Sequence, residues 1–107
     1  MEPAAPFAIT VSEQAGTTVV TVSGELDLAS TPELTAVFTQ MAERDPGEVR
    51  VDMRGVTFLD SSGISALVQA HKRLAAQGST LRLDGVGDAA RRVLEVAGLA
   101  DFFALSD

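Results

Sequence analysis

The residues best suited to chemistry are the run Asp60-Ser61-Ser62-Gly63, which stands between a predicted strand and a predicted helix. The N-terminus of a helix carries unpaired N–H groups and a partial positive charge. This end of a helix therefore suits a phosphate, whether the phosphate is bound or attached to a serine. A phosphoserine there would add nearly two negative charges to the surface without melting the helix. The run is thus a candidate for a reversible modification.

The same four residues also have an ordinary structural use. Asp and Ser are preferred caps of helix N-termini, and from residue types alone capping is the commoner of the two roles. The two roles are compatible, because one serine can cap the helix while its neighbour faces solvent.

A second stretch of interest is Gly24-Glu25-Leu26-Asp27-Leu28, which follows the second predicted strand and precedes the first helix. It lies at the end of the sheet from which the crossover helices leave, where partners tend to meet sheets with parallel strands. Asp27 is therefore a candidate for partner contact. The alternative is a solvated turn in which Asp27 helps to cap the helix.

The elements around these stretches follow from hydrophobic periodicity and from turn residues. Capping residues set the expected helix starts: Ser30 and Glu33 form a capping box, and Asp88 opens the last helix. The second helix is expected to begin near Ser62 and to end at Gly78. The predicted strands cover residues 7–11, 17–23, 49–53 and 80–83, a loop holds residues 58–60, and residues 102–105 are a short last strand or an apolar tail over the core.

This order of elements predicts an α/β fold. Strand-helix-strand units force parallel pairing through right-handed crossovers, whereas the first hairpin adds an antiparallel pair. We therefore expect a mixed β-sheet, mostly parallel with an N-terminal antiparallel hairpin, packed with α-helices. Residues 1–6 are expected to be a flexible lead-in, and residues 7–107 a single domain.

Composition excludes several classes of function. The chain has 107 residues, a formal net charge of −7 and no cysteine. Its negative charge disfavours nucleic acid and anionic membranes as partners, and the missing thiols exclude disulfides and thiolate zinc sites. Residues 1–6 do not resemble a signal peptide, and no apolar run approaches the roughly 20 residues of a membrane span. We expect a cytoplasmic protein without metal or cofactor, and a monomer when free.

An enzyme is also disfavoured. Asp60, Ser61 and His71 are the residue types of a catalytic triad, but Ser61 and His71 lie about 15 Å apart along one helix at 1.5 Å per residue. A nucleophile and its base need roughly 3 Å. His71 falls at the edge of the apolar stripe, where a packed, partly buried side chain is expected. The stretch Gly85-Val86-Gly87 lacks the later glycine of a dinucleotide-binding motif and is expected to be a connection.

The two stretches together closely resemble STAS domains of the anti-sigma factor antagonist type, over about residues 7–105. In that family an anti-sigma factor that is also an ATP-dependent kinase phosphorylates the first serine of the motif. The unphosphorylated protein binds the anti-sigma factor and releases the sigma factor. Phosphate on the serine blocks this binding, and a phosphatase restores it. The resemblance implies that Ser61 is phosphorylated and that the partner contacts are Asp27, Asp60, Ser61, Ser62 and Gly63.

STAS domains also serve as accessory subunits of lipid or anion transport complexes and as scaffolds in stress-signalling assemblies. These roles share the fold, and a fold alone does not settle function. The intact Ser61 and the lack of an added domain favour the antagonist.

Overall fold

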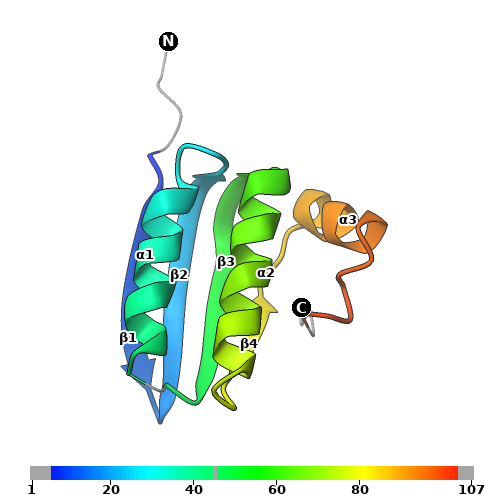
Figure 1. Cartoon of the computed structure of the whole chain (residues 1–107). Coiled ribbons are helices and arrows are strands. Elements are labelled where there is room, and N and C mark those ends of the chain that lie inside the picture. Colours follow the sequence, from blue (N-terminus) through cyan, green and yellow to red (C-terminus); the bar gives the residue numbers. More distant parts are fainter. Residues whose placement is uncertain (1–5, 45, 104–107) are drawn as a thin grey trace.

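Four strands form one mixed sheet in the computed structural model, which describes residues 6–44 and 46–103, and helices lie across one face of that sheet (Figure 1). The strands lie side by side in the order β1-β2-β3-β4. The elements in chain order are β1 Ala8–Gln14, β2 Thr17–Leu26, α1 Thr31–Ala42, β3 Glu48–Leu59, α2 Ser61–Ala75, β4 Thr80–Asp84 and α3 Asp88–Val96.

The strand pairing confirms the predicted topology. β1 and β2 form an antiparallel hairpin, and β2–β3 and β3–β4 are parallel pairs. The hairpin turns at Ala15 and Gly16, both with positive φ. Helices α1 and α2 make the two crossovers and pack on the same face of the sheet, while α3 lies beside the sheet (Figure 1).

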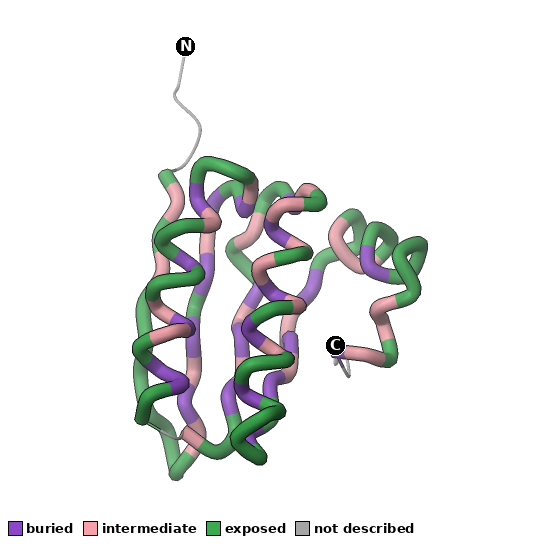
Figure 2. Tube along the Cα trace, viewed as in Figure 1, coloured by how far each residue is buried: buried purple, intermediate pink, exposed green. Residues whose placement is uncertain are grey.

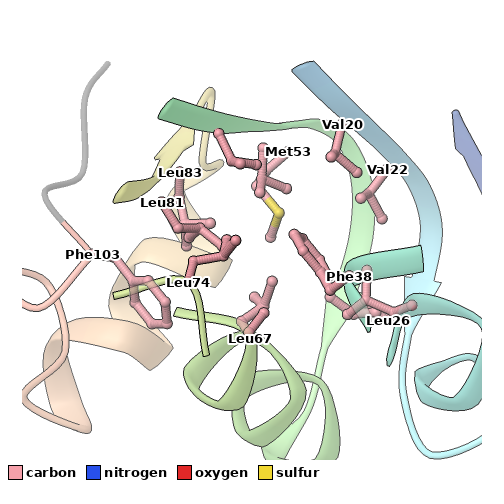
Figure 3. Close-up of a cluster of buried hydrophobic side chains, with 14 of the residues drawn as sticks. Val20, Val22, Leu26, Phe38, Met53, Leu67, Leu74, Leu81, Leu83 and Phe103 are labelled. Atoms are coloured by element: carbon pink, nitrogen blue, oxygen red, sulfur yellow. The ribbon is translucent and has the colours of Figure 1, made fainter. Parts of the chain in front are cut away.

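The core lies between the sheet and helices α1 and α2. Alternate residues of β2 and of the first half of β3 are buried, and each of the two helices buries the residues of one face (Figure 2). Met53 from the sheet, Phe38 from α1 and Leu67 from α2 converge in its centre (Figure 3). The other fully buried strand and helix residues include Val20, Val22, Leu26, Leu34, Val49, Val51, Leu74 and Leu83.

Strand β3 is much longer than predicted. It runs to Leu59, through the residues that were expected to form a loop. Two register shifts against β2 break its alternation, one between Thr21 and Ser23 and one between Gly24 and Glu25. Because bulges add unpaired residues, the second half of β3 has no period-two pattern from which a strand is predicted.

As far as it is described, the C-terminal segment is an apolar tail over the core, the second of the two predicted alternatives. Phe102 and Phe103 lie in a turn after α3, and Phe103 is fully buried. Residues 104–105 of the predicted segment, like residues 1–5 of the expected lead-in, lie outside the described residues. The expected cap at Asp88 is wrong: Gly87 is the N-cap, and Asp88 is the first residue of α3.

Candidate functional site

The two stretches singled out in the sequence meet at one end of the sheet. Leu26 at the end of β2 pairs with Leu59 at the end of β3, so both strands stop at the same level. The backbone N–H of Asp60 donates to the carbonyl oxygen of Leu26 across a distance of 3.3 Å. Asp27 and Asp60 therefore follow directly from two paired residues, and their loops are neighbours.

Asp60 is the cap of helix α2. Its backbone is extended, and its Oδ1 accepts a hydrogen bond of 3.0 Å from the N–H of Gly63. Neither serine caps the helix, although one of them was expected to, because the carboxylate one residue before them takes that place. Ser61 is the first residue of α2 and is exposed, whereas Ser62 is half-buried. The Ser61 hydroxyl thus lies at the positive end of the helix and is open to solvent.

Gly63 allows the start of α2 to lie against the end of β2. A Cβ at this position would stand 2.6 Å from the carbonyl oxygen of Leu26 and 2.9 Å from Cδ1 of Leu59. Real Cβ atoms essentially never come that close to other heavy atoms. Gly63 is buried beneath the site, and its side-chain hydrogen lets the two loops approach each other.

The loop between β2 and α1 is held by its own side chains. Asp27 Oδ1 accepts hydrogen bonds from the N–H groups of Ala29 and Ser30, at 3.0 and 3.2 Å. The buried Ser30 hydroxyl donates to the carbonyl oxygen of Glu25 and accepts from the N–H of Asp27, both at 2.9 Å. The predicted capping box of Ser30 with Glu33 is therefore wrong, because the hydroxyl points back into the loop and makes no cap bond.

Beside this loop lies a shallow hollow of about 250 Å³ with a negative lining. Glu25, Asp27 and Glu33 contribute carboxylates to it, and no basic side chain lines it. Among the described residues none of these three carboxylates forms an ion pair. The hollow is therefore an electrostatic match for a lysine or arginine of a partner.

Charges on the open face of the sheet are arranged differently. Arg50 pairs with Asp84 at 2.6 Å, and Arg54 pairs with Asp52 at 2.8 Å. The hydrogen bond from Arg54 lowers the pKa of Asp52 below its ordinary 3.8. Carboxylates on this face are thus neutralised within the molecule, whereas Glu25, Asp27 and Glu33 form no ion pair among the described residues.

Residues 9–106 match the family described as "Mlab, STAS domain". This match covers nearly the whole chain. The chain belongs to the STAS domain family.

The relatives of this STAS domain point to one type within the family. The anti-sigma-B factor antagonist of Staphylococcus aureus is 33% identical over 82% of each chain. The solved structure of an anti-sigma factor antagonist from Mycobacterium paratuberculosis has a TM-score of 0.87 at 28% identity, covering 96% of this chain and 89% of its own. Unphosphorylated SpoIIAA, an anti-sigma factor antagonist, shares the fold with a TM-score of 0.80 at 20% identity, over 94% of this chain and 89% of its own. This STAS domain is thus of the anti-sigma factor antagonist type.

Two exposed apolar residues near the site were missed in the sequence analysis. Leu28 follows Asp27 and is 74% exposed, and Phe58 stands three residues before Ser61 and is 51% exposed. Large exposed apolar side chains beside polar loops are typical of surfaces that bind other proteins. In the sequence, these two residues could have been found as large apolar residues that fit the buried pattern of no predicted strand or helix.

His71, the base of the rejected triad, lies apart from the site. His71 is on α2, ten residues after Ser61, and its ring stacks on Phe102 with a centroid distance of 4.3 Å. The half-buried ring confirms the predicted packing role. Within residues 6–44 and 46–103 no group of three possible metal ligands occurs, and no helix is long and apolar enough to cross a membrane.

Proposed function

We propose that this STAS domain binds an anti-sigma factor in its unphosphorylated form, thereby freeing a sigma factor, and that phosphorylation of Ser61 stops the binding. The observation that carries the proposal is the exposed Ser61 hydroxyl at the first position of α2. Because Asp60 already caps the helix, Ser61 has no capping role that a phosphate would disrupt. The serine can therefore change its charge while the fold stays intact.

The surroundings of Ser61 supply a reason why a phosphate would block docking. The exposed apolar side chains of Leu28 and Phe58 lie within two residues of the paired strand ends, Leu26 and Leu59, that precede the two loops of the site. A partner that covers them must remove water from the serine as well. Removing water from a neutral hydroxyl costs little free energy, whereas removing it from a phosphate with nearly two charges costs much more. The phosphate also occupies the space that the partner would contact.

The expected kinase is the anti-sigma factor itself. During phosphorylation the Ser61 oxygen forms a bond to the γ-phosphorus of ATP, the bond between that phosphorus and the oxygen of the leaving ADP breaks, and the serine hydroxyl loses its proton. A serine phosphatase would hydrolyse the ester and restore the hydroxyl. Exposure of Ser61 supports access by both enzymes, and the half-buried Ser62 is the poorer substrate.

The proposal is tested by mapping phosphosites on the protein from its own host and by titrating variants with the copurifying kinase. Phosphate is expected on Ser61, in a fraction that changes with growth conditions. Ser61→Asp is expected to weaken binding at least tenfold, because it places a charge in the contact, whereas Ser61→Ala keeps the parent affinity and takes no phosphate. Ser62→Ala is the matched control and is expected to be phosphorylated as the parent is. Parent-like binding by Ser61→Asp would contradict the charge switch.

A further inference from the structure

An apolar groove lies next to the serine, between the last residues of β3 and helix α3. It has a volume of about 350 Å³. Two side chains that line it, Phe58 and Val93, are large, apolar and exposed, at 51% and 38%. The apolar residues of its lining are Val56, Phe58, Leu59, Ala89, Ala90 and Val93.

Strand β3 presents a free edge toward this groove. β4 pairs with β3 only from Glu48 to Asp52, and β3 continues to Leu59. After β4 the chain turns at Gly85, which has φ +68°, and continues into α3, which contacts β3 across the groove (Figure 1). No strand of the described chain pairs with the last seven residues of β3 on that side. An unpaired strand edge is a template for an added strand.

We propose that an extended segment of the anti-sigma factor lies along this free edge of β3 and seats an apolar side chain between Phe58 and Val93. The inference rests on the proposed function, since it concerns the same partner. Residues 56–59 alone offer about 13 Å of edge at 3.3 Å per residue, enough for a short added strand.

The position and charge of the groove favour this partner over others. Phe58 is three residues from Ser61, so a segment in the groove is continuous with a contact at the serine. The acidic hollow at Glu25, Asp27 and Glu33 lies beside the neighbouring β2–α1 loop and carries no basic side chain in its lining. The exposed Asp88 adds a further carboxylate to the groove lining. The complementary segment is therefore apolar at its centre and basic at its flanks.

Two valines of α3 allow a matched test. Val93 lines the groove, and Val96, one turn later on the same helix, is 84% exposed and does not line it. Val93→Lys and Val96→Lys make the same change in charge and size. The test compares the affinities of the two variants, each with Ser61 unphosphorylated, for the purified anti-sigma factor that phosphorylates the parent at Ser61. Val93→Lys is expected to weaken binding at least tenfold, and Val96→Lys less than twofold.

A second variant and a second measurement distinguish a lost contact from a misfolded variant. Phe58→Ser removes the opposite wall of the groove and is expected to weaken binding at least tenfold, and thermal unfolding shows whether each variant is folded. Amide hydrogen exchange in residues 54–59 is expected to slow when the partner binds, because the added strand covers the edge. Equal affinities for the two valine variants, or unchanged exchange at residues 54–59 in the complex, would overturn the inference.

The two proposals fail in different ways. If no host protein both binds the parent and phosphorylates Ser61, the proposed function is wrong and the groove loses its partner. If such a protein binds the parent but not Ser61→Asp, and the groove variants bind as the parent does, only the groove inference is wrong.

Discussion

Gly63 shows how one missing side chain sets the geometry of the proposed switch. Its position beneath the site lets the first turn of α2 rest on the carbonyl oxygen of Leu26. Any other residue would push the helix start away from the end of β2. Ser61 would then move relative to Asp27, although neither residue had changed.

Gly63→Ala tests this close approach. Alanine is the better helix former by about 1 kcal/mol, which alone would stabilise α2. The clash with the backbone of Leu26 outweighs this gain, since overpacking costs about 1–3 kcal/mol and backbone atoms give way poorly. We expect a lower free energy of unfolding in urea. The control is Ser65→Ala, at an exposed position of the same helix, whose free energy of unfolding should equal or slightly exceed that of the parent. A stabilised Gly63→Ala would contradict the close contact with Leu26.

At the scale of elements, the start of α2 divides two tasks between adjacent residues. Asp60 satisfies a backbone N–H of the helix, and its charge suits the positive helix end. Ser61, the next residue, makes no capping bond and faces solvent. Because Asp60 and not Ser61 caps the helix, the phosphate proposed for Ser61 could be added and removed while the helix stays folded.

Substitution at the cap separates these tasks. Asp60→Ala removes the hydrogen bond to Gly63 and is expected to lower the free energy of unfolding by about 1 kcal/mol. Asp60→Asn keeps a side-chain acceptor and is expected to lose much less unfolding free energy than Asp60→Ala, since Asn caps about as well as Asp. Ser62→Ala is expected to change stability by only a few tenths of a kcal/mol, because Ser62 is not the cap. Chemical denaturation of the three variants checks this order, and a larger loss in Ser62→Ala than in Asp60→Ala would reverse the assignment.

On the scale of the whole molecule, the sheet places recognition and stability in different regions. The helix-facing side of β2 and β3 is filled by the core, and the loops at the ends of these strands carry the site (Figure 2). The C-terminal segment closes the side of the core near α2, where Phe103 packs edge-on to Phe102 at 5.0 Å and to His71 at 5.9 Å. The tail is therefore part of the fold.

Phe103→Ala tests the contribution of the tail. The side chain is fully buried, so its removal leaves a cavity and is expected to cost about 3–5 kcal/mol of unfolding free energy. Small domains have about 5–15 kcal/mol in total, so the variant should be close to unfolding at moderate temperature. Phe58→Ala, which truncates a half-exposed phenylalanine, should lose far less unfolding free energy than Phe103→Ala. Similar midpoints of thermal unfolding for the two variants would show that the tail does not support the core.

The sequence by itself determined the α/β class, the strand order and the position of the serine motif. These features depend on local signals: alternation in β2, helical spacing in α1 and α2, and a strand that leads directly into Asp60 and Ser61. Crossover handedness then leaves little choice of topology. The parallel pairing of the strands followed from the same signals, whereas the meeting of Asp27 with Asp60 at one end is a finding of the structure.

Only the tertiary structure decided which side chains cap, which glycine is required and where a groove lies. Ser30, Ser62 and Asp88 are all residue types that cap helices, yet the cap depends on how the loop before each helix is held. The extension of β3 past its bulges depends on pairing with β2, which is 30 residues away in sequence. The groove between β3 and α3 exists because β4 stops at Asp84, and such a gap arises from the relative lengths of distant elements and not from any local pattern.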